Sequence, residues 1–98
     1  FAWTDPPSRV YNLIRTQTHY GGCPVVHAPS GRTLWILWGW LDVPDETHPD
    51  AAPGTVVRVE DDRVWVALTG GTTLRITQRA PDHLILTEGD LLTHGSPQ

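Results

Sequence analysis

Residues 55–78 read TVVRVEDDRVWVALTGGTTLRITQ, and this stretch decides the fold class. Apolar and polar side chains alternate along it at the period of two that a β-strand imposes. Turn residues interrupt the alternation at Asp61-Asp62 and at Gly70-Gly71, and a pair of glycines is a frequent hairpin signal. The pattern therefore predicts three consecutive strands, which are Thr55–Glu60, Arg63–Leu68 and Thr72–Gln78.

Period two also divides the side chains of these strands between two faces. The apolar face should line the core, and it carries Val57, Val59, Val64, Val66, Leu68, Leu74 and Ile76. The other face carries Arg58, Arg63, Trp65 and Arg75. Arginine pairs bidentately with phosphate and tryptophan stacks on a base, so these four residues are candidates for binding a nucleotide-linked ligand. The alternative interpretation is that the indole covers an apolar seam and the arginines stack on it or pair with Glu60 and Asp62.

The most apolar segment, Thr33–Leu41, is rich in Trp, Ile and Leu at both alternating positions, which predicts a strand covered on both faces. Period two places Trp35, Leu37, Gly39 and Leu41 on one face and Leu34, Ile36, Trp38 and Trp40 on the other. Only one face can line a barrel of this size. The opposite face must then meet the N-terminal helix, through Val10 and Ile14, or a second protein surface, and we expect both contacts. The partner surface is expected at Trp35, Leu37 and Trp38, and at least one tryptophan of this strand should stay partly exposed in the isolated chain.

The rest of the chain supplies one helix and several shorter strands. Thr4-Asp5-Pro6-Pro7 predicts a helix start, Val10, Leu13 and Ile14 form its apolar face, and Gly21-Gly22 ends it. Short strands are predicted at Val25-Val26, Leu84–Leu86 and Leu91-Leu92, and a surface loop at Asp42–Pro53. Together these elements predict a mainly β fold, a small closed or partly closed barrel of five to six strands with one N-terminal α-helix.

Length and charge limit the classes of partner. The 98 residues suffice for one compact core, so residues 1–98 are predicted to form a single domain. The net charge of -4, with no lysine, makes nucleic acid an unfavourable partner. No segment has the pattern of a membrane helix or a signal peptide, and the single cysteine, Cys23, favours a cytoplasmic location. The chain opens at Phe1 without an initiator Met, which suggests a segment of a longer protein.

No set of residues has the spacing of a metal site or a catalytic motif. The five histidines are scattered singly, at positions 19, 27, 48, 83 and 94. Metal sites usually pair such ligands at short spacing, so no metal is predicted. Cys23 lies near His19 and His27 in the sequence but lacks a third, orienting group, so a packed thiol is expected rather than a nucleophile.

Residues 10–22 read VYNLIRTQTHYGG and resemble the signature that opens the C-terminal domain of the formyltetrahydrofolate-dependent formyltransferases. Other similar segments occur in the family's order, and they are Trp3, residues 34–36 (LWI), 53–57 (PGTVV), 72–76 (TTLRI) and 88–92 (EGDLL). The resemblance implies that the barrel is OB-like. Asn12, Arg15, Gly21 and Gly22 match the family's structural motif, and we interpret Asn12 and Arg15 as clamps on the turn at Tyr20–Cys23.

The resemblance also implies where the chemistry takes place. In this family an Asn, a His and an Asp of an N-terminal, Rossmann-like domain transfer the formyl group, and the folate binds there. Nothing in this chain is similar to those motifs. The resemblance therefore implies no catalytic residue and no cofactor in this domain, and it places 10-formyltetrahydrofolate only in an associated catalytic domain. The family tends to carry Lys or Arg where Trp35 and Trp38 stand, and the apolar replacement favours contact with a protein surface.

Three functions follow from these observations. The first is a non-catalytic accessory domain that packs on a formyltransferase catalytic domain and helps position the acceptor, which is an amino sugar, a small amine or a carrier-bound amino acid. The second is a tRNA-binding domain of a methionyl-tRNA formyltransferase-like enzyme, for which a basic surface would be expected. The third is a stand-alone barrel used for protein association.

Overall fold

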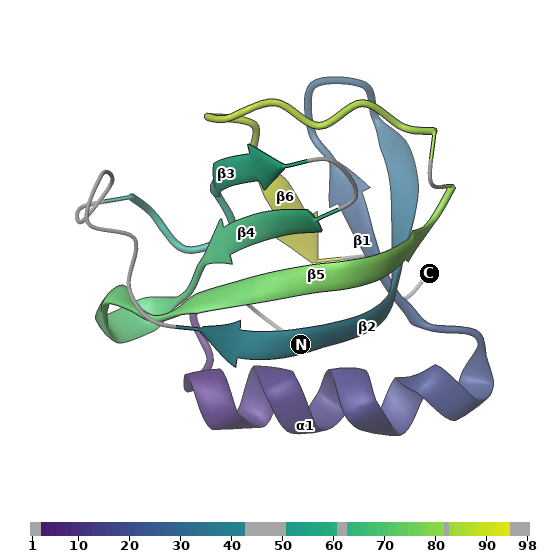
Figure 1. The fold of residues 1–98 in the computed structure, drawn as a ribbon, viewed down its shortest axis with the longest axis vertical. Helices are drawn as coiled ribbons and strands as arrows, with labels where there is room; N and C mark the ends of the chain where they lie inside the picture. The colour runs from purple at the N-terminus through teal and green to yellow at the C-terminus, as the bar shows by residue number, and fades with distance from the viewer. Residues whose placement is uncertain (1–2, 43–50, 61–62, 82, 95–98) are drawn as a thin grey trace.

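The computed structural model describes residues 3–42, 51–60, 63–81 and 83–94, and in these ranges the chain is mainly β with one α-helix (Figure 1). The elements in chain order are α1 (Pro7–Gln17), the 3-10 turn η1 (Thr18–Tyr20), β1 (Cys23–His27), β2 (Arg32–Asp42), β3 (Val56–Glu60), β4 (Arg63–Ala67), the 3-10 turn η2 (Thr69–Gly71), β5 (Thr73–Ala80) and β6 (Leu92–His94). No helix in these ranges is long and apolar enough to cross a membrane.

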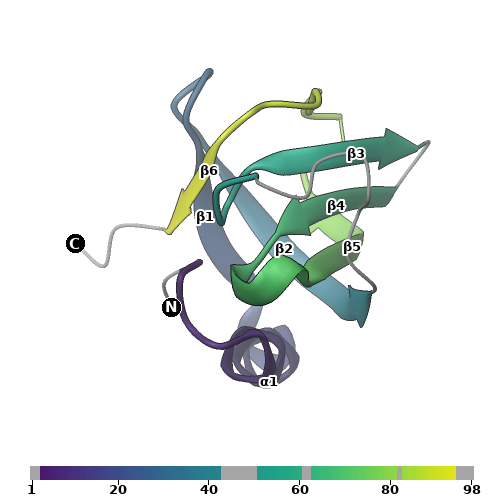
Figure 2. The ribbon, with the colours of Figure 1, turned by 90° about the vertical axis from the view of Figure 1, so that its left-hand side faces the viewer.

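The strands form one antiparallel sheet in the order β3-β4-β5-β2-β1-β6, which curls above α1 (Figure 2). The curl brings its two edges together. Thr55 forms an antiparallel bridge with Leu91, and the Leu92 N–H donates to the Gly54 carbonyl at 2.8 Å. Closure of this kind satisfies edge groups that an open sheet would expose. The prediction of a small, partly closed barrel with one N-terminal helix is confirmed.

Helix α1 lies along β2 and covers that side of the sheet (Figure 1). Its two inward side chains, Val10 and Ile14, are fully buried, as the apolar spacing predicts. Proline occupies its first position, where a missing N–H costs nothing. The chain then turns through Gly21 and Gly22, both at positive φ. Gly22 has a φ of +105°, and a Cβ there would lie 3.0 Å from the Ile36 carbonyl oxygen of β2, so glycine is favoured where the turn approaches the strand.

The main core fills the inside of the curled sheet. It consists of Trp3, Val10, Ile14, Cys23, Val25, Leu34, Ile36, Val56, Val64, Val66, Leu68, Leu74, Ile76, Leu84, Leu86 and Leu92. The prediction for Val57 is wrong. A register shift between Val56 and Arg58 gives β3 an extra residue, so Val57 packs with Trp65 and Ala67 in a second, smaller cluster. A bulge of this kind inverts the alternation on one side of it.

The predicted faces of β2 are also wrong beyond Ile36, and again bulges are the cause. The register shifts between Ile36 and Trp38 and again between Trp38 and Gly39. Ile36 is fully buried in the core, whereas Trp40, predicted on the same face, is 42% exposed. Gly39 faces inward instead, where an added Cβ would lie 3.2 Å from Leu74 Cδ1. Trp38 and Trp40 therefore lie on the outer face of the sheet, which we define as the face turned away from the main core.

Three local predictions differ from the structure in smaller ways. Gly70-Gly71 belongs to η2 rather than to a two-residue hairpin loop. Residues 84–86 alternate between buried and exposed as a strand would, but they pair with no neighbour in the described part of the chain. Asp42 ends β2 instead of opening a loop, and residues 43–50 of that predicted loop lie outside the described residues.

Candidate functional site

A groove of about 450 Å³ lies on the seam between α1 and β2. We name it the α1–β2 groove, and its lining residues are Asn12, Arg15, Thr16 and Trp38. The first three come from successive turns of one helix face, and the fourth comes from the outer face of the neighbouring strand. The groove therefore combines an aromatic wall with an amide, a hydroxyl and a guanidinium.

The bulged segment of β2 presents Trp38 to this groove. The bulge at Leu37 turns the next side chain out of the core, as bulges beside functional sites often do. Helix α1 holds the bulge, because the Thr18 hydroxyl lies 2.8 Å from the Leu37 carbonyl and 3.0 Å from the Ile14 carbonyl. A carbonyl displaced from regular pairing thus keeps a hydrogen bond. This contact joins the end of the helix to the strand that carries the indole.

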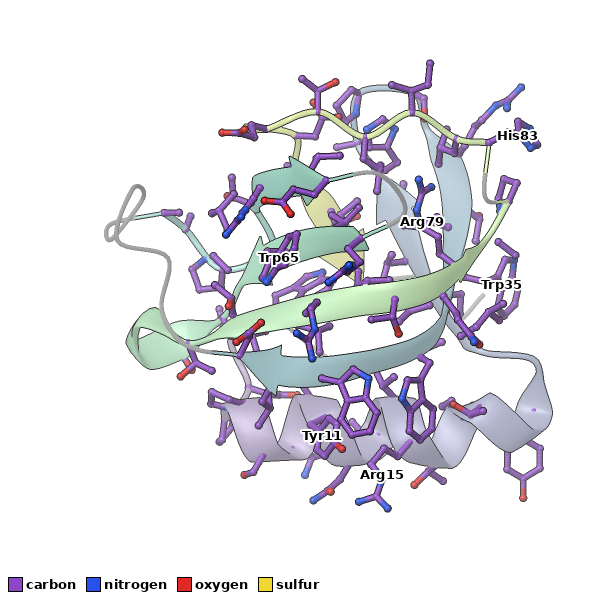
Figure 3. The ribbon with its side chains drawn as sticks, in the orientation of Figure 1. Tyr11, Arg15, Trp35, Trp65, Arg79 and His83 are labelled. Carbon is purple, nitrogen blue, oxygen red and sulfur yellow. The ribbon has the colours of Figure 1, made fainter. Side chains whose placement is uncertain are left out.

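Ring contacts fix the orientation of the aromatic side chains. The Trp38 and Trp40 rings meet edge to face, with centroids 5.5 Å apart and planes at 78°. Tyr11 lies 6.4 Å from the Trp40 ring, and the Arg15 guanidinium lies 5.4 Å from the centre of the Tyr11 ring. Figure 3 shows Tyr11 and Arg15 close together on α1. The aromatic row and the guanidinium therefore form one continuous surface across the helix and the strand.

The structure brings together three of the four residues predicted to bind a ligand. Arg58 and Arg75 are the register partners of Trp65 on β3 and β5. The Arg58 guanidinium lies 4.8 Å from the Trp65 ring centre and pairs with Glu60. Arg63 stands at the end of β4 as the register partner of Glu60.

The side chains of Arg58, Trp65 and Arg75 are already engaged in contacts with other residues of the chain. Trp65 is only 9% exposed, and its indole N–H donates to Asp42 at 3.1 Å. Arg75 lies 3.5 Å from the same carboxylate. A base could stack on the indole only by displacing Arg58, which matches the alternative interpretation of the cluster. Ligand binding there stays a prediction.

Trp35 also lies on β2 but apart from the groove, as Figure 3 shows. Its register partners are Pro24 of β1 and Ala80 of β5, and it is 40% exposed. Leu37 and Trp38, predicted with it as interface residues, are half-buried. The prediction that a tryptophan of this strand stays partly exposed is confirmed by Trp35 and Trp40.

The side chains of Asn12 and Arg15, which were predicted to clamp the turn, line the α1–β2 groove, and the clamp stays a prediction. Thr18 ties the end of the helix to β2, and the Gly22 N–H donates to the Gln17 carbonyl at 3.0 Å. These two bonds hold the end of the helix and the turn without the side chains of Asn12 and Arg15.

Sequence reasoning missed a polar triplet, centred on the buried His27, beside the barrel closure. His27 Nε2 lies 2.7 Å from Asp90 Oδ2, and His27 Nδ1 lies 2.7 Å from Ser30 Oγ. The hydrogen bond from His27, aided by one from the Thr87 N–H, holds the pKa of the Asp90 carboxyl below its ordinary value. His27 and Asp90 lie 63 residues apart in the sequence, so no motif spacing could have predicted their contact.

This triplet resembles a Ser-His-Asp arrangement but is built as a structural latch. Acyl transfer needs N–H donors aimed at a developing oxyanion. The N–H groups of Ser30 and Gly31 both donate to the His27 carbonyl, and the Arg32 N–H donates to Ser30 Oγ. With these donors already used, the triplet ties the β1–β2 turn to residues 87–90. In the described ranges, no three His, Cys, Asp or Glu residues gather as metal ligands.

Comparison with known proteins identifies the family. The family profile for the formyl transferase C-terminal domain matches residues 1–89. The chain belongs to the formyl transferase C-terminal domain family. This formyltransferase domain is 30% identical over 79 residues to the methionyl-tRNA formyltransferase of Geobacillus thermodenitrificans, covering 81% of this chain and 23% of that enzyme. It is 33% identical over 79 residues to the enzyme of the same name from Bacillus velezensis, with the same coverage of both chains.

The formyltransferase domain thus spans about a quarter of the length of these relatives. No solved structure matches it. The family predicted from residues 10–22 is confirmed. Trp38 and Arg15 of the α1–β2 groove both fall inside the matched region.

Proposed function

We propose that the chain is a non-catalytic accessory domain that packs on a formyltransferase catalytic domain and helps position the formyl acceptor. The acceptor classes are an amino sugar, a small amine or a carrier-bound amino acid. The observation that carries this proposal is the exposure of Trp35 and Trp40, at 40% and 42%, on the outer face of a sheet whose core is complete without them.

Two large indoles left 40% and 42% exposed are a cost that folding alone does not explain. Full burial of a large apolar side chain contributes about 1.5–3 kcal/mol, so covering the exposed part of each indole contributes roughly 1 kcal/mol. Tryptophan, tyrosine and arginine are also the residues most enriched among binding hot spots. Trp40 has Tyr11 beside it and Arg75 as its register partner, which gives the outer face that composition. A partner protein surface accounts for this arrangement better than folding does.

The buried latch supports placing the chemistry in another domain. Its histidine is 4% exposed, and the neighbouring N–H donors are engaged. A domain built in this way contributes shape and contacts. Formyl transfer and 10-formyltetrahydrofolate binding then belong to the catalytic domain on which it packs.

A domain graft tests the proposal. The 98-residue chain replaces the corresponding C-terminal segment of the Geobacillus thermodenitrificans enzyme, and the truncated enzyme serves as the reference. We expect the graft to raise formyl transfer and thermal stability above those of the truncated enzyme. Trp35→Asp and Trp40→Asp should each cancel that gain and change the stability of the isolated chain by less than about 1 kcal/mol. A folded graft as inactive as the truncated enzyme, or one insensitive to both substitutions, would contradict the proposal.

The names of the relatives favour tRNA binding as a second candidate function. Charge argues against it, because the net charge is -4 and the outer-face cations Arg58 and Arg75 lie beside Glu60 and Asp42. Neutralised cations release few counterions from a phosphate backbone. Filter binding with initiator tRNA at about 150 mM salt should give only the nonspecific range, roughly 10⁻⁴ to 10⁻⁶ M. A nanomolar complex would reverse the order of the two candidates.

A further inference from the structure

The geometry points to the α1–β2 groove as a binding site for a small organic anion, a molecule with a flat ring and a phosphate or carboxylate group. This inference goes beyond the accessory function, because it concerns a small ligand of the groove in the isolated chain and not the protein surface proposed to cover Trp35 and Trp40. It rests on the donors that line the groove, on the ring that walls it and on the bulge that places the ring there.

Hydrogen-bond donors without protein partners dominate the groove. Arg15 has no carboxylate or hydrogen-bond partner in the described ranges, although its guanidinium carries five N–H groups. The Asn12 amide and the indole N–H of Trp38 also lack partners within these ranges. The one hydroxyl, on Thr16, is used within the helix, where it donates to the Asn12 carbonyl at 2.9 Å. A surplus of donors is matched by a ligand rich in acceptors, and an anionic oxygen group supplies the most.

Arg15 of α1 differs from Arg58 and Arg75 on the outer face of the sheet. Arg58 pairs with Glu60, and Arg75 lies 3.5 Å from Asp42. The Arg15 guanidinium lies over an aromatic ring instead, and its position in the last turn of α1 favours a cation. These contacts hold the group in place but satisfy none of its N–H donors. It is therefore an oriented cation available to a ligand.

The indole of Trp38, which forms one wall of the groove, favours a ligand with a flat ring as well as an anionic group. Trp38 is half-buried, and its ring is held edge to face by Trp40, so it is fixed before any ligand arrives. A flat ring can pack against an indole at little entropic cost when the indole is already ordered. The bulge at Leu37, next to Trp38, interrupts the regular pairing of β2 with β5, and the Thr18 hydroxyl binds its carbonyl. The bulge turns Trp38 out of the core and presents its indole to the groove.

Phenyl phosphate is the probe that tests both requirements together. Calorimetry and the indole N–H signals in NMR spectra of the full chain should show saturable binding with a Kd on the order of 1 mM. Inorganic phosphate lacks the ring and benzyl alcohol lacks the charge, so each should bind at least about 10-fold more weakly. The indole signal that shifts most should be the one lost in Trp38→Phe, and this variant, which keeps a flat ring, should retain binding within about 5-fold.

A matched pair of arginine variants separates the groove from general charge effects. Arg15→Gln should weaken phenyl phosphate binding at least about 10-fold. Arg9→Gln removes the same charge from the same helix, outside the groove and beside Asp5, and should leave the Kd unchanged. Equal effects of the two variants, or no binding up to about 20 mM phenyl phosphate, would overturn the inference. So would a short single-stranded RNA that binds 10-fold more tightly than phenyl phosphate, since that would assign the surface to a polyanion.

Discussion

Replacing Asp90 with alanine removes the acceptor at the centre of the buried latch. Asp90 Oδ2 accepts hydrogen bonds from His27 Nε2 at 2.7 Å and from the Thr87 N–H at 2.9 Å. The first donor is buried, so losing its partner costs about 1–3 kcal/mol, and the second bond adds about 0.5–1.5 kcal/mol. We expect Asp90→Ala to lower the free energy of unfolding by about 2–4 kcal/mol at pH 7. For a domain of this size the melting temperature falls by roughly 10–20 °C.

Low pH should reduce the difference in unfolding free energy between the wild type and Asp90→Ala. Because the His27 hydrogen bond holds the pKa of Asp90 below the ordinary value, about 3.9, the folded chain keeps the carboxylate ionised where the unfolded chain protonates it. The contribution is therefore complete above about pH 5 and is lost as the pH falls through the folded-state pKa. The gap between wild type and Asp90→Ala should narrow steadily below about pH 4.

Urea unfolding followed by circular dichroism measures both effects. Glu60→Ala is the control, because it removes a carboxylate from an exposed pair with Arg58 and should cost no more than about 0.5 kcal/mol. An Asp90→Ala effect as small as that of the control, or a gap that stays constant between about pH 3 and pH 7, refutes the reasoning about the latch.

Three further predictions concern the fold. Gly54→Ala should lower the free energy of unfolding by about 2–4 kcal/mol, because Gly54 has a positive φ and an added Cβ would lie 2.6 Å from the Leu92 carbonyl oxygen. Gly31→Ala is the control: Gly31 also has a positive φ, but its Cβ would meet open space, so the cost should be only about 1–2 kcal/mol. Thr18→Val removes the hydroxyl that joins α1 to the bulge, and urea unfolding should show a loss of about 1–2 kcal/mol. Burial raises the pKa of the Cys23 thiol, so alkylation by iodoacetamide at pH 8 should be at least about 10-fold slower in buffer than in urea, and equal rates would contradict the burial.

The sequence was most informative where the structural signal is local. The alternation in residues 55–78 correctly predicts β3, β4 and β5, because each strand carries its own period-two pattern. The helix could be predicted for the same reason, since Val10 and Ile14 repeat at helical spacing over an apolar core. Both signals depend only on residues a few positions apart.

The features that build the groove and the latch depend on contacts between distant segments. A bulge exists only relative to a partner strand, so nothing in the residues around Leu37 shows that β5 pairs with a shifted register. The latch joins His27 to Asp90, which no spacing rule connects. Sequence reasoning therefore singled out the aromatic strand as a candidate interface but grouped Trp38 and Trp40 with Leu34 and Ile36 on one face, which the bulges separate.

The closure of the barrel has a consequence for folding kinetics. Strand β6 pairs with β1, so the register pair of Val25 and His94 joins two segments that are far apart in the chain. The bridge between Thr55 and Leu91 forms between segments that are also far apart in the chain. Contacts of high sequence separation slow folding, because loop entropy is lost before they form. We therefore expect the pairing of β6 with β1 and the Thr55–Leu91 bridge to form late in folding, after the pairs between strands that are adjacent in the chain.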